Sequence, residues 1–357
     1  MPLKLKCLHC KAVLSWPNQD SEMLLCICGK NYPQTLQIPD LRTDQDPYCG
    51  NQQDRLIANA LVEQFPQKNF RELLDFYYAQ FCPELNPDDK QRQVHHILNH
   101  SDNLAYFHEL KPTEKSNCLL DIGCGTGTAL IQARFASPNL EAIGLDVAMR
   151  WLILARKRLD EAGLAEIRLV CCNAEQIPFD DSQFHFIHGG DMIEHVPAQV
   201  PVFQEVARLL KDGGTALFLT PNRSSFTREP HVGLYFAGWL PRKLSVRYCR
   251  LFKAPPWRGI FTHTARGWRR LIIIALGCHN PMNFAVDPAE VGVGNRDIGR
   301  FVKFYNHCIR RFRIIRNLAR LFGPVLKITM ENHRHSTHAP ASPFGQAPGM
   351  NQCDGQG

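Results

Sequence analysis

The stretch LLDIGCGTGT at residues 119–128 decides the fold class of this chain. An apolar run at residues 119–122 leads into a loop with three glycines, and an amphipathic stretch follows at residues 129–135. This is the order strand, tight turn and helix. Because glycine has no Cβ, the loop backbone can adopt positive φ and approach a bound molecule closely. The stretch therefore predicts a ligand-binding turn between a strand and a helix of an α/β fold.

The glycine spacing distinguishes this loop from a dinucleotide-binding loop. The dinucleotide fingerprint is G-x-G-x-x-G. Here the glycines stand at 123, 125 and 127, and Thr128 occupies the place of the third dinucleotide glycine. Asp121 also precedes the first glycine by two positions. Around the loop, residues 113–285 alternate short apolar runs with amphipathic stretches, which predicts β-α units over a mostly parallel sheet.

Further predicted strands end on polar residues. LEAIGLD at residues 140–146 predicts a second strand that ends on Asp146, a carboxylate that can accept hydrogen bonds from both hydroxyls of a ribose. LVCCNAE at residues 169–175 predicts a third strand followed by Asn173 and Ala174. PFDDSQFHFIH at residues 178–188 then leads into a fourth strand.

These segments, in this order and spacing, resemble the class I S-adenosylmethionine-dependent methyltransferases with a type 11-like domain. The resemblance implies an α/β, Rossmann-like, doubly wound and mostly parallel seven-stranded sheet, with S-adenosyl-L-methionine (SAM) as cofactor. It also implies that Asp121 helps to hold the amino-acid end of the cofactor and that Asn173 and Ala174 border the adenine. The residues expected to bind the cofactor are Asp121, Gly123, Gly125, Gly127, Asp146, Asn173 and Ala174.

DMIEHV at residues 191–196 follows the predicted fourth strand, where ligands bind in open α/β sheets. At helical spacing, Asp191, Glu194 and His195 share one face. The same spacing in the ubiquinone-biosynthesis O-methyltransferases implies a divalent cation, so that magnesium is a candidate cofactor. His195 is the candidate general base because a neutral imidazole accepts a proton near pH 7. The alternative is that Glu194 and His195 cap and pack the start of a helix.

An aromatic insertion at residues 224–241, punctuated by glycine and proline, follows the predicted fifth strand. With the preceding TPNR it resembles the T-P-N-R…D-P-H-V-G-L segment of bacterial methyltransferases for sugars and the cell envelope, where substrate-covering elements lie. Asn222 and His231 are expected to contact the acceptor, and Tyr235 and Trp239 to wall its pocket. The alternative is that the aromatic residues form the core of the insertion itself.

Two cysteine pairs lie on either side of a hairpin-length spacer near the N-terminus. Cys7 and Cys10 are followed by Cys26 and Cys28, and paired thiolates on two turns suit a tetrahedral zinc site. A segment of about 40 residues has little core, so the metal would supply much of its folding energy. The segment resembles the small zinc ribbon that precedes several bacterial methyltransferase domains, although its second pair is C-x-C and not C-x-x-C. The predicted role of zinc is structural. A cysteine-rich loop without metal is the alternative.

Composition divides the chain into five predicted parts: a zinc ribbon at 1–45, a helical linker or lid segment at 46–112, a SAM-binding domain at 113–285, a basic helical segment at 286–330 and a disordered tail at 331–357. The net charge of +7 permits an acidic partner without requiring one. The start of the chain has no apolar leader, and a cytoplasmic location is expected. The basic segment is expected to pack on the sheet, with contact to the inner membrane face or to RNA as alternatives.

The predicted function is methyl transfer from SAM to an oxygen or nitrogen atom of a small-molecule, sugar or lipid-linked acceptor. A zinc-ribbon RNA methyltransferase is the first alternative, but no N-P-P-Y-type motif follows the predicted fourth strand. A non-catalytic partner subunit that keeps the SAM fold is the second alternative. The intact glycine loop and Asp146 argue against it. The oligomeric state is left open.

Overall fold

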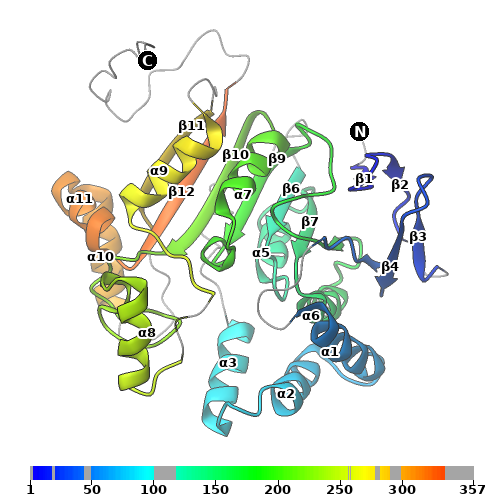
Figure 1. Ribbon diagram of the computed structural model, residues 1–357, viewed down its shortest axis with the longest axis horizontal. Coiled ribbons are helices and arrows are strands. Elements are labelled where there is room, and N and C mark those ends of the chain that lie inside the picture. The colour runs from blue at the N-terminus through cyan, green and yellow to red at the C-terminus, as the bar shows by residue number, and fades with distance from the viewer. Residues whose placement is uncertain are drawn as a thin grey trace.

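The computed structural model describes residues 3–17, 21–43, 50–99, 118–255, 257, 259–277, 282–289 and 299–333. A seven-stranded sheet runs through its middle, with a small β-module at the N-terminal end of the chain on one side (Figure 1). The helices α8, α10 and α11 gather at the opposite side (Figure 1). The predicted tail lies outside the described residues from residue 334 onward.

The central sheet has the strand order β11-β12-β10-β9-β6-β7-β8. Strands β6 to β10 run parallel, and β12 runs antiparallel between β10 and β11. The predicted Rossmann-like, mostly parallel seven-stranded sheet is therefore confirmed. The strands are β6 (Cys118–Ile122), β7 (Glu141–Asp146), β8 (Arg168–Cys171), β9 (Phe184–Gly190), β10 (Leu210–Pro221), β11 (Met282–Pro288) and β12 (Val325–Asn332).

Strand β12 comes from the segment that was predicted as helical and basic. Leu326, Ile328 and Met330 are fully buried, and the residues between them are partly exposed, which is the alternation of a strand between two neighbours. Its position next to β10 is set by pairing with a strand more than 100 residues earlier in the chain. The sheet therefore includes strands beyond residue 285. The predicted division of the chain into domains stays a prediction.

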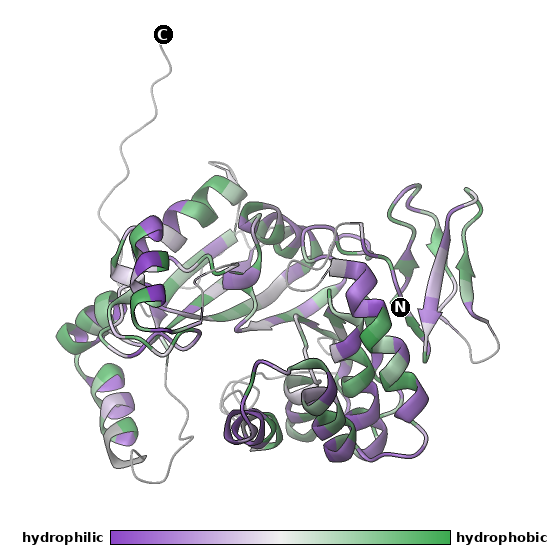
Figure 2. Ribbon diagram, turned by 60° about the horizontal axis from the view of Figure 1, so that its bottom comes forward, coloured by the Kyte–Doolittle hydropathy of each residue, from purple (hydrophilic) through white to green (hydrophobic). Residues whose placement is uncertain are grey.

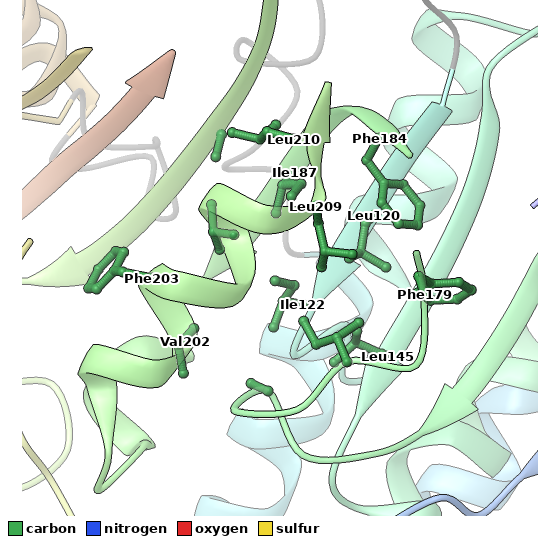
Figure 3. Close-up of a cluster of buried hydrophobic side chains, with 14 of the residues drawn as sticks. Leu120, Ile122, Leu145, Phe179, Phe184, Ile187, Val202, Phe203, Leu209 and Leu210 are labelled. Atoms are coloured by element: carbon green, nitrogen blue, oxygen red, sulfur yellow. The ribbon is translucent and has the colours of Figure 1, made fainter. Parts of the chain in front are cut away.

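Successive residues of the strands contribute to two cores, one on each face of the sheet. Leu120 and Ile122 belong to the core on the face that α7 (Gln199–Leu209) and α9 (Ala265–Leu276) cover, and Phe203 of α7 is part of the same core (Figure 3). Leu119 belongs to the core on the other face, which α5 (Thr128–Ala136) and α6 (Met149–Glu161) cover. The helices α1 (Gly50–Gln64) and α2 (Phe70–Phe81) pack on α6, and α3 (Pro87–Asn99) packs on α2.

The N-terminal module is joined to the β8 edge of the sheet. It contains β1 (Leu5–Lys6), β2 (Val13–Leu14), β3 (Met23–Leu25), β4 (Asn31–Thr35) and β5 (Ile38–Pro39). Near the end of the module, Asp40 forms a parallel β-bridge with Cys171. The Leu41 amide also donates a hydrogen bond to the Cys171 carbonyl at 2.8 Å. The Arg168 guanidinium lies 4.5 Å from the ring centre of Trp16. The module is therefore held directly beside the carboxyl end of β8.

The remaining elements lie after β9 and β10. They are the single turns η1 (Ile193–His195) and η2 (Ala237–Trp239), and the helices α8 (Arg242–Leu251), α10 (Gly299–Arg311) and α11 (Arg313–Phe322). Within the described parts of the chain, every helix is too short or too polar to cross a bilayer.

Candidate active site

The carboxyl ends of β6, β7, β8 and β9 surround a cavity of about 650 Å³. This is the place where open α/β sheets bind ligands. The volume lies within the range of small-molecule and cofactor sites. The lining residues are Gly123, Gly125, Leu145, Asp146, Val147, Ala148, Arg150, Trp151, Cys172, Asn173, Ala174, Glu175, Asp191, Met192, His195, Val196 and Pro197.

The glycine loop forms the floor of this cavity because its backbone turns back onto β7. The amides of Gly123 and Cys124 both donate to the Leu145 carbonyl, at 2.8 and 2.9 Å. Gly123 has a φ of +70°, and a Cβ built on it would lie 2.5 Å from the Cβ of Met192. Only glycine fits this position, since both the backbone angle and the space exclude a side chain.

Asp146, at the end of β7, is fixed by two backbone amides. Its Oδ2 accepts from the Gly125 amide and its Oδ1 from the Ala148 amide, both at 2.9 Å. The carboxylate is therefore held against the glycine loop at the cavity wall. Oxygen atoms held in this way can still accept further hydrogen bonds from a diol, because each carboxylate has about four lone-pair sites.

Asn173 and Ala174 also line the cavity, and the last residue of the N-terminal module contacts Asn173. The Thr43 amide donates to Asn173 Oδ1 at 3.0 Å. Trp151 and Met192 line the cavity too and were not predicted from the sequence. Trp151 could have been found from its position, because it lies in the first turn of the helix that follows Asp146 and β7.

A buried ion network joins the N-terminal module to α1 and α6 beside the cavity. Arg42 pairs with Asp40 at 2.7 Å and with Asp54 at 2.6 Å, and it also donates to the Val147 carbonyl. Asp54 in turn pairs with Arg150 at 2.7 Å and accepts from the amide of Met149. This network was missed from the sequence because its members are up to about 100 residues apart in the chain.

Asp121 lies below the glycine loop at the end of β6, is almost fully buried and does not line the cavity. Its Oδ1 lies 2.7 Å from Nδ1 of His188 on β9. Its Oδ2 has no hydrogen-bond partner among the described residues. A buried carboxylate oxygen without a partner is costly unless a ligand supplies a donor.

Two histidines and two glutamates meet next to the cavity. His195 Nε2 and His231 Nε2 are 3.2 Å apart, and His231 Nδ1 lies 2.6 Å from Glu229 Oε1. Glu229 is further held by the amides of His231 and Val232, at 2.8 and 3.0 Å. Glu194 is fully buried beside the two imidazoles and accepts from the Thr220 hydroxyl at 3.0 Å. Glu229 was not predicted, although its spacing of two residues before His231 allowed this local contact.

Electrostatics give the two histidines different proton affinities. Burial and the charge of His231 lower the pKa of His195 to about 4. Burial also acts to lower the pKa of His231, but the hydrogen bond and charge of Glu229 outweigh it, so that this pKa is raised. Burial, together with Asp191, raises the pKa of the Glu194 carboxyl. His195 is therefore neutral near pH 7, whereas His231 binds a proton more readily.

Asp191, Glu194 and His195 do not share one helix face as expected. The helical segment is the single turn η1, and Asp191 precedes it with a φ of 49°, which turns the backbone away from a helix. The groups that lie close enough to hold a cation are Glu194, His195 and His231, with ligand atoms within 4.8 Å of one another. Magnesium prefers octahedral oxygen ligands, which two imidazoles and one carboxylate do not supply. We therefore assign no step to magnesium.

None of the four predicted acceptor residues is among those that line the cavity. His231 meets His195 beside the cavity, and the other three lie elsewhere. Asn222 is buried, and its side chain bonds to the carbonyls of Arg320 and Leu321 and to Ser224. Tyr235 and Trp239 are about half exposed on the outside of the insertion. Contact of these three residues with an acceptor stays a prediction.

The four cysteines of the N-terminal module meet at one point. The Sγ atoms of Cys10 and Cys26 lie 3.4 Å apart and those of Cys7 and Cys28 3.8 Å apart, and all four lie within 4.8 Å of one another. A tetrahedral zinc ion with Zn–S bonds of about 2.3 Å requires sulfur atoms roughly 3.8 Å apart. The C-x-C spacing of the second pair therefore still brings both of its sulfurs to the site, and the residues fit a structural zinc ion.

Comparison with known proteins agrees with this geometry. Residues 119–214 match a methyltransferase domain family. A demethylmenaquinone methyltransferase of Bacillus cytotoxicus is 25% identical over 164 residues, which are 46% of this chain and 68% of that protein. One of Listeria welshimeri is 32% identical over 107 residues, which are 30% of this chain and 45% of that protein. The chain thus spans about half to two thirds of the length of these relatives.

Among solved structures, phosphoethanolamine N-methyltransferase 2 of Haemonchus contortus, in complex with phosphomonomethylethanolamine and S-adenosylhomocysteine, superimposes with a TM-score of 0.45 and 16% identity. The match covers 75% of this chain and 60% of that chain.

The strand order, the glycine loop under the cavity and the matched domain family together define a class I SAM-dependent methyltransferase domain. SAM is accordingly the cofactor of this domain. The N-terminal cysteine cluster is compatible with a zinc ribbon placed before it.

Proposed function

We propose that this chain transfers a methyl group from SAM to an oxygen or nitrogen atom of a small-molecule, sugar or lipid-linked acceptor. When bound, SAM supplies a methyl group that its sulfonium already activates. The observation that carries the proposal is the array of His195, His231 and Glu229 beside the cofactor cavity, because it can remove a proton from an acceptor. The demethylmenaquinone methyltransferases among the relatives favour a lipid-like acceptor.

In this proposal, different cavity residues bind different parts of the cofactor. Asp146 accepts hydrogen bonds from the ribose hydroxyls, and Asn173 and Ala174 border the adenine. The apolar surfaces of Trp151 and Met192 exclude water around it. Asp121 lies beneath the glycine loop and does not line the cavity, so its contact with the amino-acid end of the cofactor stays a prediction.

The proton of the acceptor passes to the histidine pair. Glu229 accepts from Nδ1–H of His231 and so leaves His231 Nε2 as the basic atom, the same arrangement by which a carboxylate orients an imidazole in a catalytic triad. His195 lines the cavity, and its Nε2 lies 3.2 Å from His231 Nε2, so a proton that the acceptor gives to His195 Nε2 can move on to His231 Nε2. We infer that the proton rests on His231, where the charge of Glu229 stabilises the imidazolium.

We also propose that the cysteine cluster of Cys7, Cys10, Cys26 and Cys28 holds a structural zinc ion. Four thiolates leave no open coordination position for substrate or water. The ion would fix the module whose last residues, up to Thr43, contact the cofactor cavity through Asn173.

The proposal is tested by the pH dependence of methyl transfer. Labelled SAM is first supplied with a panel of hydroxylated quinones, sugars and amines, and the best acceptor is then used with Glu229→Gln. Removing the carboxylate lowers the pKa of His231, so the acid limb of the rate profile should move to lower pH. The maximal rate should fall by roughly 10²-fold or more, which is the usual contribution of general base catalysis.

The matched control is Glu166→Gln, a substitution at an exposed ion pair with Arg134. It should leave both the rate and the pH profile unchanged, and S-adenosylhomocysteine affinity should be the same in all three proteins. An unchanged pH profile in Glu229→Gln would show that the pair does not accept the proton. Absence of transfer to every acceptor class by a protein that binds S-adenosylhomocysteine would favour the partner-subunit alternative.

A further inference from the structure

All charged residues of three helices are basic, and these helices lie at the end of the molecule opposite the N-terminal module (Figure 1). The sequences of α8, α10 and α11 hold 11 of the 41 lysines and arginines of the chain and none of its 34 acidic residues. The rest of the chain therefore carries more acidic than basic residues. Such segregation creates a local positive field that a uniformly mixed surface lacks.

The same helices expose apolar side chains. On α11, Ile314, Leu318 and Leu321 are 76%, 53% and 39% exposed and follow each other at spacings of four and three, so they share one helix face. Phe304 on α10 and Leu251 on α8 are also exposed. Figure 2 shows apolar and polar residues alternating along these helices. Exposed aliphatic rows flanked by cations are typical of helices that lie in a membrane interface.

This face is continuous with the aromatic insertion beside the candidate active site. Phe322, at the end of α11, stacks on Phe226 with ring centres 4.8 Å apart and on Trp239 at 5.8 Å. Phe226, Phe236 and Trp239 are themselves about half exposed. The same insertion carries Glu229 and His231, and Glu229 lines one small pocket together with Phe236. The aromatic cluster therefore lies close to the proton-accepting array.

We propose that α8, α10, α11 and this aromatic cluster form a docking face for an anionic lipid surface. Aliphatic side chains gain free energy in the acyl region of a bilayer, and the surrounding cations are attracted to anionic headgroups. Nucleic acid would match the cations but not the aliphatic row, because phosphates and base edges offer it no apolar partner. A symmetric second copy would place basic helices against each other.

The link between this face and a lipid-linked acceptor rests on the proposed function, but binding to lipid is measured without it. The full chain is mixed with vesicles of phosphatidylcholine alone and of phosphatidylcholine with phosphatidylglycerol, and bound protein is separated by flotation. We expect binding to the anionic vesicles only, with an affinity that falls as salt rises.

Two double variants separate the apolar and the charged contributions. Ile314→Ser with Leu318→Ser removes the aliphatic row, and Arg311→Gln with Arg313→Gln removes two exposed cations. Each should lower the vesicle partition coefficient at least tenfold. The matched controls are Leu56→Ser and Arg71→Gln, two exposed residues of α1 and α2. Figure 1 shows these two helices apart from α10 and α11. Both control variants should bind vesicles as the unaltered chain does.

S-adenosylhomocysteine affinity is measured for every variant and should not change, which shows that each remains folded. The inference is overturned if the unaltered chain does not float with anionic vesicles, or if both double variants bind as well as the controls. It is also overturned if Ile314→Ser with Leu318→Ser instead dissociates a dimer, or if the basic face binds RNA and no vesicles. Loss of S-adenosylhomocysteine binding in the unaltered chain would count against the proposed function and not against this face.

Discussion

Replacing Arg42 with methionine tests whether the N-terminal module is energetically part of the cofactor site. The Arg42 side chain is 1% exposed and lies between two buried carboxylates, Asp40 at 2.7 Å and Asp54 at 2.6 Å. Methionine keeps most of the apolar stem and removes the guanidinium. Removing one partner of a buried ion pair typically costs about 3–5 kcal/mol, because the remaining charge is left uncompensated.

The structure places the expected cost at the lower end of this range, about 3 kcal/mol. Asp54 keeps Arg150 at 2.7 Å, so that only Asp40 is left without a close cation. Its remaining partner, Arg55, lies at 3.5 Å and is 59% exposed. Arg55→Met is therefore the matched control, with an expected cost below about 1 kcal/mol because exposed ion pairs contribute little.

The assay is urea denaturation followed by tryptophan fluorescence, with S-adenosylhomocysteine affinity measured on the folded variants. Arg42→Met should also weaken binding, because Arg42 holds the Val147 carbonyl next to Asp146. If Arg42→Met is no less stable than Arg55→Met, the buried network does not stabilise the chain, and the reasoning is refuted.

The same network makes a prediction about pH. Burial acts to raise the pKa of Asp40, but the hydrogen bond and charge of Arg42 outweigh it, so the pKa of this carboxyl is lowered. A lowered folded-state pKa contributes stability above the unfolded value, about 3.9, and this stability is lost as the pH falls toward the folded value. The difference in unfolding free energy between the unaltered chain and Arg42→Met should therefore shrink below about pH 4.

Two further predictions concern the cavity and the metal. Gly123→Ala should lower S-adenosylhomocysteine affinity at least about tenfold, since its Cβ would clash with Met192 and strain of this kind costs on the order of 1–3 kcal/mol. Gly213→Ala, which also has positive φ but open space around it, should leave the affinity unchanged in the same calorimetric titration. The purified chain should contain about one zinc per molecule, and stripping it with a chelator should weaken S-adenosylhomocysteine binding, because Thr43 then loses its fixed place at Asn173. A zinc-free protein with full affinity would contradict both statements about the ribbon.

The sheet and the cofactor loop could be predicted because their signals are local. The glycine loop directly follows a strand, and Asp121 and Asp146 lie at strand ends. The alternation of apolar runs and amphipathic stretches predicts the β-α units of the sheet. Strand β12 could not be predicted, because its place between β10 and β11 depends on pairing with distant strands. The expectation of a shared helix face at residues 191–195 failed because one residue, Asp191, adopts a left-handed φ.

In the candidate active site, too, some residues could be predicted from the sequence and others could not. His231 was expected near the acceptor from its position in the insertion, and the structure brings it to His195 across 36 residues of sequence. Glu229 and the Arg42 network were not expected, since their roles arise only when the insertion and the N-terminal module fold back onto the sheet. Most residues of the predicted cofactor motifs thus line the cavity, whereas contacts between distant segments complete the candidate site.

The most direct test of the central claim is calorimetric titration of the purified chain with S-adenosylhomocysteine, alongside Asp146→Ala and the exposed control Asp181→Ala. Hydrogen bonds to a charged group contribute roughly 1.5–3 kcal/mol each, so the loss of one or two of them should weaken binding by about tenfold or more. The predicted result is saturable binding by the unaltered chain and Asp181→Ala, and strongly weakened binding by Asp146→Ala. Absence of binding by the folded unaltered chain, or equal binding by all three, would contradict a SAM site at the end of β7.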